Sequence, residues 1–316
     1  MAYDGRIMQR ALARFDEDKQ RRGAQLEQRR RTAYARAPRL AEIDTELRGT
    51  MSRIISSALA RGTDPLPAIR VLRDENLQLQ RERVQLLASL GYPADWLEEK
   101  PACAQCGDTG YVQGGVCPCL RAYYAREQLA ELSRLLPLGE DSFETFSFDW
   151  YDSTVQPAFG VSPRENMERN FDVCRDYAYQ FDRGGGNLLL SGGTGLGKTF
   201  LSACIARVVS ENGFSVVYDT AASVFSRFED AKFRRDDGGS EDADRCMKCD
   251  LLILDDLGTE MTTAFVQSAL YQIVNGRLME KRATIISTNL APEEIGSRYG
   301  RSVLSRLEGE YEILPF

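Results

Sequence analysis

The sequence predicts an α/β fold, a parallel sheet flanked by helices, preceded by an α-helical domain and a small module built on four cysteines. Three observations predict this arrangement. A glycine-rich loop separates an apolar run from a helical pattern at residues 187–200, a second apolar run ends in two aspartates at 251–256, and four cysteines cluster at 103–119. With 316 residues, of which 43% are hydrophobic, the chain is long enough for two domains.

The glycine-rich loop has the pattern of a phosphate-binding loop. It fits G-x-x-x-x-G-K-[ST] through Gly192, Gly193, Thr194, Gly195, Leu196, Gly197, Lys198 and Thr199. Glycine adopts at low cost the torsions that aim main-chain amides at phosphate oxygens, and the next helix turns its positive end toward the same anion. We expect Lys198 to reach the β- and γ-phosphates and Thr199 to hold Mg²⁺. The alternative is a plain glycine-rich turn, which the flanking strand and helix disfavour.

The second apolar run supplies the acidic groups of the expected site. Leu251–Leu254 reads as a buried parallel strand, and Asp255 and Asp256 follow at its carboxyl end, where open α/β sheets bind ligands. We expect Asp255 to be a Mg²⁺ ligand and Asp256 to orient or deprotonate the attacking water. A further strand at 284–289 ends in Asn289, which could hydrogen-bond the water or the γ-phosphate.

Residues 1–100 show helical periodicity and no catalytic constellation. We expect Pro38 to break the first helix, a second helix to begin near Ala41 and end at Gly62, and a third to start at Asp64-Pro65 and stop at Gly91. The module either binds another protein or only packs on the rest of the chain.

Charge is distributed unevenly. Residues 1–40 hold 11 Lys and Arg against 5 Asp and Glu, whereas the other 276 residues hold 29 against 42. The basic head, residues 1–40, predicts an acidic partner, protein or nucleic acid, or else a solvated helix face.

The chain has no histidine, which excludes His general bases and His metal ligands. The charged N-terminus and the lack of a long apolar run predict a cytoplasmic protein that does not contact membrane.

The cysteine cluster predicts a structural zinc site. Cys103-x-x-Cys106 is followed after ten residues by Cys117-x-Cys119, and four thiolates form a closed tetrahedral set. Such a site stabilises a segment too short to build a core of its own. An iron–sulfur cluster is the lesser alternative, because it also uses four cysteines. Cys246-x-x-Cys249 has no second pair nearby and is interpreted as packing.

Between these modules, residues 121–140 read as a helical linker, and 164–182 as a helix with Met167 and Phe171 inward. The aromatic stretch Phe143–Tyr151 either covers the adenine base or packs on the core.

The expected helix at 221–233 interleaves aromatic and basic residues, a composition suited to binding single-stranded nucleic acid. The alternative is an amphipathic helix that packs on the core. The candidate nucleic-acid contacts are Phe225, Arg227 and Lys232 in this helix, and Arg234 just after it. Residues 236–244 read as an acidic loop, and 311–314 as a closing edge strand.

In this order, the motifs resemble an AAA+ ATPase core. More closely, the LLILDDLG of residues 251–258 and the TIISTN of 284–289 resemble the DnaC/DnaI group of bacterial replicative helicase loaders, which is grouped with the IstB-type transposition helpers. The cysteine segment resembles the DnaI-like branch. The resemblance covers residues 40–316. It implies that 192–199 is Walker A, Asp255 and Asp256 Walker B, Asn289 sensor 1, and Arg306 an arginine finger, with Arg301 a second candidate.

The resemblance also implies a domain plan and a function. The plan is an α-helical partner-binding domain at 1–100, the zinc module at 101–120, a linker helix at 121–140, and an AAA+ domain at 141–316 lacking a C-terminal lid. The function is ATP-dependent loading of a hexameric DnaB-type helicase, with single-stranded DNA bound and self-association through Arg306. Asp256 stands where many AAA+ proteins have Glu, which implies slow hydrolysis stimulated by a partner or by DNA.

Three rivals follow from the same motifs. An IstB-like transposition helper would use the same core on duplex DNA, and the zinc module argues against it. A small-molecule P-loop kinase would need a substrate lid and a basic phosphate clamp, and neither is visible in the sequence. A nucleotide-binding adaptor would bind ATP without hydrolysing it.

Overall fold

The structure is a computed structural model that describes residues 3–59, 66–135, 142–157, 160–182, 185–233 and 237–316. The chain forms two compact units. One contains Met1–Ala13 together with Gly114–Phe316, and the other contains Arg14–Gln113. Among the described residues, no helix combines the length and apolar character that a membrane span requires.

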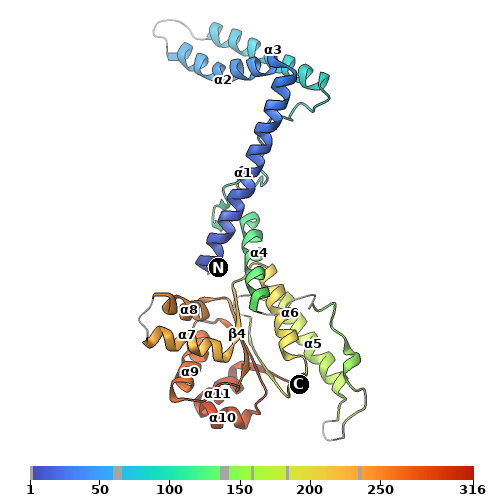
Figure 1. The fold of residues 1–316 in the computed structure, drawn as a ribbon, viewed down its shortest axis with the longest axis vertical. Coiled ribbons are helices and arrows are strands. Elements are labelled where there is room, and N and C mark those ends of the chain that lie inside the picture. Colours follow the sequence, from blue (N-terminus) through green and yellow to red (C-terminus); the bar gives the residue numbers. More distant parts are fainter. Residues whose placement is uncertain (1–2, 60–65, 136–141, 158–159, 183–184, 234–236) are drawn as a thin grey trace. The chain divides into compact units, whose positions relative to one another are not determined.

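A five-stranded sheet forms the centre of the first unit, and all its pairs are parallel (Figure 1). The strand order is β4-β5-β6-β3-β7. The strands are β3 (Asn187–Ser191), β4 (Val216–Thr220), β5 (Leu251–Leu257), β6 (Ala283–Thr288) and β7 (Tyr311–Pro315). The predicted α/β class is confirmed, and β7 is an edge strand as expected.

Helices cover both faces of this sheet, which explains why its strands are almost continuously apolar. Successive strand residues point to opposite faces, so Leu188 and Leu190 join one core while Leu189 joins the other. On the first face lie α4 (Pro118–Leu135), α5 (Pro163–Tyr179) and α6 (Lys198–Glu211). On the second lie α7 (Ala221–Phe233), α8 (Asp237–Lys248), α9 (Ala264–Met279), α10 (Pro292–Tyr299) and α11 (Arg301–Glu310).

Helix α8 corrects one expectation, because part of the stretch expected to be an acidic loop, residues 237–244, is helical. Two physical features stabilise this helix despite its glycines. Arg245 and Lys248 lie in its last turn, where positive charge complements the helix dipole. Cys246 is fully buried in the core that α8 shares with α7. Tertiary packing therefore outweighs a composition that is typical of loops.

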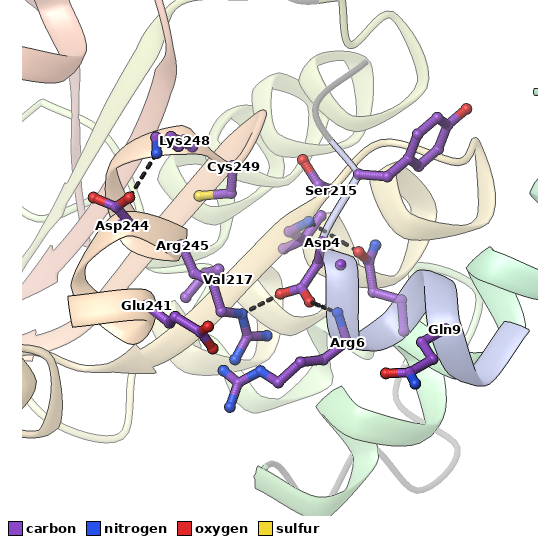
Figure 2. A pocket seen from close by; sticks show the side chains of 14 residues that line it. Asp4, Arg6, Gln9, Ser215, Val217, Glu241, Asp244, Arg245, Lys248 and Cys249 are labelled. Carbon is purple, nitrogen blue, oxygen red and sulfur yellow. Dashed lines mark hydrogen bonds and ion pairs between the residues drawn. The ribbon is translucent and has the colours of Figure 1, made fainter. Parts of the chain in front are cut away.

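The first residues of α1 (Gly5–Arg36) belong to the same unit as the sheet. Ile7 and Ala11 are buried, and the Asp4 amide donates to the Tyr124 hydroxyl at 3.0 Å. Asp4 and Arg245 line a cavity of about 380 Å³ at the β4 edge, and they form an ion pair there (Figure 2). Some of the basic residues of the head thus form ion pairs with acidic residues of the same chain: Arg6 pairs with Asp242, and Arg10 pairs with Glu131.

The second unit contains the rest of α1, followed by α2 (Pro38–Leu59) and α3 (Leu66–Ser89). The helix break falls at Ala37, and Pro38 begins α2, three residues before the predicted start. Proline is tolerated at the first helical position because its missing N–H has no partner there. A small core forms from Ala33, Leu40, Leu87 and Leu97. The predicted cap at residues 64–65 lies outside the described residues.

Candidate active site

The glycine-rich loop joins β3 to α6 at the carboxyl edge of the sheet. A side chain at Gly192 would clash with the Phe316 carbonyl group, so only glycine fits. Gly197 is the N-cap of α6 with a φ of +95°, a conformation that favours glycine. The loop therefore delivers the amino end of α6, with its positive dipole, to the edge where ligands bind in open α/β sheets.

Lys198 is 5% exposed and reaches back over this loop. Its ammonium group donates to the carbonyls of Gly192 and Gly193, each at 2.7 Å, and to Asn289 Oδ1 at 2.8 Å. Burial lowers the pKa of Lys198, and the nearby Asp256 and Asp255 carboxylates oppose that shift. The structure thus brings together Lys198 and Asn289, two residues that separate motifs predict for the site.

Asp255 lies on β5 between two neighbouring strands, and both of its carboxylate oxygens accept hydrogen bonds. Tyr218 from β4 donates to Oδ2 at 2.7 Å, and Ser287 from β6 donates to Oδ1. The Thr199 hydroxyl lies 3.4 Å from the same Oδ1. A hydroxyl and a carboxylate are the hard oxygen donors that Mg²⁺ prefers, so Thr199 and Asp255 fit the predicted magnesium site.

Asp256 lies within a register shift in the pairing of β5 with β6, between Leu254 and Leu257. Its φ is +55°, a left-handed conformation that costs roughly 1–2 kcal/mol for a residue other than glycine. Its amide donates to the Ser287 hydroxyl at 3.0 Å, which stabilises this turn of the chain. Burial, with Asp255 adding to it, raises the pKa of Asp256, while Lys198 acts against the shift. A more basic carboxylate is better suited to accept a proton from water.

Arg306 lies on α11, where residues of α9 hold its side chain. Its Nε donates to Asn275 Oδ1 at 2.8 Å, and its guanidinium carbon lies 4.9 Å from the centre of the Tyr271 ring. In the described part of the chain, no hydrogen bond or ion pair joins Arg306 to the phosphate-binding loop of the same molecule. Arg301, at the start of α11, is exposed.

The aromatic stretch before the sheet packs on the core and also contacts the site. Phe143 is buried, and Phe146 and Phe148 pack against the same core. The Tyr151 hydroxyl donates to the Leu196 carbonyl of the phosphate-binding loop at 3.1 Å. Neither this contact nor the role of Tyr218 was predicted from the sequence. The one feature of the sequence that could have indicated Tyr218 is its position, because it places a hydroxyl-bearing side chain close to the carboxyl end of a strand.

The structure distinguishes among the three candidate nucleic-acid contacts that lie on α7. Phe225 is 3% exposed and belongs to the core, so its ring cannot stack on a base in this conformation. Arg227 forms an ion pair with Asp219, and Lys232 is exposed with its ammonium group 5.5 Å from the centre of the Phe265 ring. Arg234 lies outside the described residues. At Phe225, therefore, the alternative of an amphipathic helix that packs on the core is confirmed.

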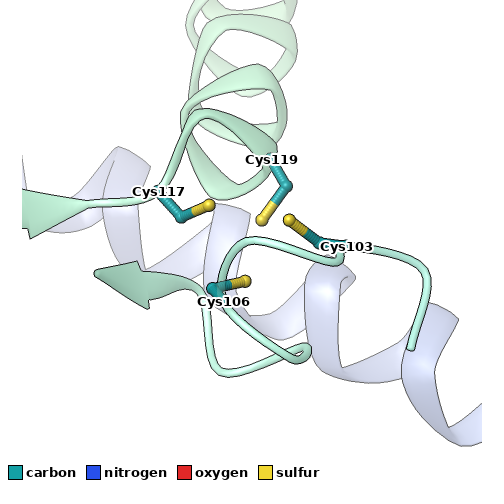
Figure 3. A group of neighbouring side chains, drawn as sticks. All are labelled: Cys103, Cys106, Cys117 and Cys119. Atoms are coloured by element: carbon teal, nitrogen blue, oxygen red, sulfur yellow. The ribbon is translucent and has the colours of Figure 1, made fainter.

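The four cysteines of residues 103–119 lie together (Figure 3). Their sulfur atoms all lie within 4.8 Å of one another, which is compatible with four sulfur ligands around one tetrahedral metal ion. Tight turns with positive φ at Gly107 and Gly110 and a two-stranded ladder, β1 (Tyr111–Val112) with β2 (Gly115–Val116), shape the segment. The cluster could bind zinc.

The other cysteine pair differs from this cluster. Cys246 and Cys249 are buried in the core beside α7, as expected for packing residues. Burial raises the pKa of Cys246 to about 12, which keeps its thiol protonated and unreactive.

Comparison with known proteins agrees with this geometry. Residues 174–307 match the family described as IstB-like ATP binding protein. The replicative helicase loader DnaC of Escherichia coli strain K12 is 31% identical over 145 residues, which are 45% of this chain and 58% of that protein. DnaC of Buchnera aphidicola subsp. Baizongia pistaciae is 27% identical over 137 residues, 43% and 55% of the two chains. The crystal structure of a DnaC helicase loader superimposes with a TM-score of 0.48 and 19% identity, over 57% of this chain and 98% of that one.

The chain spans somewhat more than half the length of the curated relatives that it matches. The shared region contains the glycine-rich loop, the aspartate pair and Asn289, which are the residues that the fold brings to one edge of the sheet. The resemblance that these motifs indicated is therefore confirmed: residues 174–307 match the family described as IstB-like ATP binding protein, and part of the chain is similar to DnaC-type helicase loaders.

Proposed function

We propose that this chain is an ATPase that loads a replicative helicase onto DNA. The observation that carries the proposal is the meeting of Lys198, Asp255 and Asn289 at one edge of the sheet, in a sequence related to DnaC. Arrays of this kind bind nucleoside triphosphates and position a water molecule for attack on the terminal phosphate.

Each residue of the site has a role that its surroundings support. Lys198 and the amides of the loop bind the phosphates, and Thr199 and Asp255 would hold Mg²⁺, which neutralises phosphate charge when bound. Asp256 accepts a proton from the attacking water, and Asn289 orients that water or the γ-phosphate. An aspartate reaches less far than a glutamate, so we infer slow hydrolysis that a partner or DNA accelerates.

The partners are proposed from the named function of the relatives and from the residues exposed here. The relatives are replicative helicase loaders, so we propose a hexameric replicative helicase as the protein partner. Exposed Lys232, with Arg234, would contact the phosphates of single-stranded DNA, and Phe225 takes no part because it is buried. Arg306 would act on ATP bound to a neighbouring copy of the chain.

The test uses the full chain. The host's hexameric helicase is immobilised, and the chain is captured with and without ATP and Mg²⁺, while ATP turnover is measured with and without single-stranded DNA. We expect capture of the chain and DNA-stimulated turnover in the wild type. We also expect at least about a 100-fold loss of turnover in Lys198→Ala, because transition-state charge loses its main cation.

The exposed Lys248→Ala, which removes a lysine outside the site, should behave as the wild type. Unaltered turnover in Lys198→Ala contradicts the site assignment. Turnover without capture of the helicase contradicts the loader assignment. Capture of a transposase and binding of duplex DNA in its place would favour the transposition helper, the second candidate.

A further inference from the structure

Tyr218 has a relationship to the site that no sequence motif contains. It lies on β4, is 2% exposed, and donates its hydroxyl hydrogen to Asp255 Oδ2 at 2.7 Å. We propose that Tyr218 is a positioning residue that, with Ser287, fixes the Asp255 carboxylate in the orientation needed to hold magnesium. The inference rests on the proposed ATPase function and adds a residue to the site.

The register of the sheet explains how Tyr218 reaches Asp255. In the parallel pairing of β4 with β5, Tyr218 lies opposite Ile253, and Thr220 lies opposite Asp255. Residues two apart along a strand share one face, so Tyr218 and Asp255 are diagonal neighbours on the same face. A diagonal separation is within reach of a long aromatic side chain and too far for a short one.

The carboxylate is held from two sides by two different strands. Tyr218 from β4 binds Oδ2, and Ser287 from β6 binds Oδ1, which also lies next to the Thr199 hydroxyl. Two donors on separate oxygens leave the carboxylate little freedom to rotate about its own bond. Groups that orient a metal ligand in this way typically contribute roughly 10- to 100-fold to metal affinity or activity.

The alternative is a purely structural role, in which Asp255 only provides a hydrogen-bond acceptor for the buried Tyr218 hydroxyl. The two readings differ in what happens when the hydroxyl is removed and the ring is kept. If the role is packing, Tyr218→Phe changes stability alone. If the role is positioning, the same variant changes how nucleotide binding and turnover depend on Mg²⁺ concentration while the fold stays intact.

The matched control is Tyr311→Phe. Tyr311 is a buried tyrosine on β7 of the same sheet, and it pairs in register with Asn187, at the end of β3 farthest from the glycine-rich loop. It therefore reports the effect of removing a buried tyrosine hydroxyl from this sheet without touching the carboxylates, and without the loss of a hydrogen bond like that of Tyr218.

The experiment titrates Mg²⁺ against the affinity of a fluorescent ATP analogue, and measures kcat, KM and melting temperature for the full chain. For Tyr218→Phe we expect the half-saturating Mg²⁺ concentration to rise roughly 10-fold and kcat to fall roughly 10-fold. KM at saturating Mg²⁺ should stay within about twofold, and the melting temperature should match that of Tyr311→Phe within about 4 °C. Ser287→Ala should raise the Mg²⁺ midpoint in the same direction.

An unchanged Mg²⁺ midpoint in a folded Tyr218→Phe overturns the inference, and so does an equal shift in Tyr311→Phe. If Tyr218→Phe does not fold, Ser287→Ala decides, and an unchanged midpoint in that variant overturns the inference as well. These failures leave the proposed function standing as long as the wild type hydrolyses ATP and Lys198→Ala does not. A wild type that binds no nucleotide contradicts the proposed function itself.

Discussion

The ammonium nitrogen of Lys198 lies 2.8 Å from the side-chain oxygen of Asn289, although 91 positions separate the two residues in the sequence. Parallel pairing of β3 with β6 produces this contact, because Ser191 lies opposite Thr288: Asn289 directly follows β6, and the glycine-rich loop that follows β3 leads to Lys198. The adjoining β5 contributes Asp255 and Asp256 at the same edge. Three strand ends thus bring together a cation, an amide and two carboxylates.

Replacing the proposed general base should separate catalysis from binding. We expect Asp256→Asn to lower kcat by at least about 100-fold, because an amide cannot accept the proton of the attacking water. The affinity for ATP should stay within roughly threefold, since the phosphate ligands Lys198 and Thr199 are untouched. Steady-state turnover and equilibrium nucleotide binding measure the two effects.

The control for this prediction is Asp149→Asn, which removes a carboxylate whose side chain is 88% exposed and should alter neither quantity. A kcat in Asp256→Asn equal to that of the wild type would exclude Asp256 as the base.

The ion pairs around Glu131 should make the first unit acid-sensitive. Burial alone would raise the pKa of Glu131, but hydrogen bonds from Arg10 and Arg245 outweigh it and hold the pKa below its ordinary value of 4.5. Charged Glu131 therefore stabilises the fold above that value, and this stability is lost as pH falls through the lowered pKa. At pH 7, Glu131→Gln should cost about 1 kcal/mol, or roughly 2–4 °C in melting temperature.

Melting curves between pH 3 and 7 test this expectation about Glu131. The difference between wild type and Glu131→Gln should shrink as the solution becomes acidic. Exposed Glu17 on α1 provides the control, because Glu17→Gln should melt like the wild type throughout. A Glu131 difference that stays constant with pH would show that lost packing, and not charge, is responsible.

The cysteine cluster should bind one zinc ion per chain. Elemental analysis of the purified protein should give a 1:1 ratio, and Cys103→Ser should lose the metal and destabilise its short segment. Cys204→Ala, which removes a buried sulfur from α6, should keep the full zinc content. Zinc retained in Cys103→Ser, or iron in its place, would contradict the assignment.

The elements with strong local signals were predictable from the sequence, and those fixed by distant contacts were not. The glycine-rich loop and the apolar strand before Asp255 carry their own chemistry, and both were located correctly. Helix α8 was missed because packing of Cys246 determines it, not composition. For Phe225 the sequence leaves a nucleic-acid contact and a core position both open, because a helical pattern does not show which face a sheet will cover. Tyr218 was missed because its role depends on the β4–β5 register, which one sequence does not reveal.

Arg306 should act on nucleotide bound by a neighbouring copy of the chain. Asn275 and Tyr271 hold its guanidinium in place, and no carboxylate among the described residues forms an ion pair with it. We expect Arg306→Ala to bind ATP normally and to lose at least about 100-fold in turnover, since an arginine finger stabilises charge only in the transition state.

Mixing two inactive variants tests whether this arginine acts between chains. Lys198→Ala cannot use ATP but still presents Arg306, and Arg306→Ala binds ATP but lacks the finger. If assembly is random and head-to-tail, an equal mixture should recover about one quarter of wild-type turnover, because a quarter of the contacts pair an intact site with an intact arginine. The double variant Lys198→Ala/Arg306→Ala, mixed with Arg306→Ala, should recover nothing. An inactive first mixture would mean that Arg306 does not act across a subunit contact.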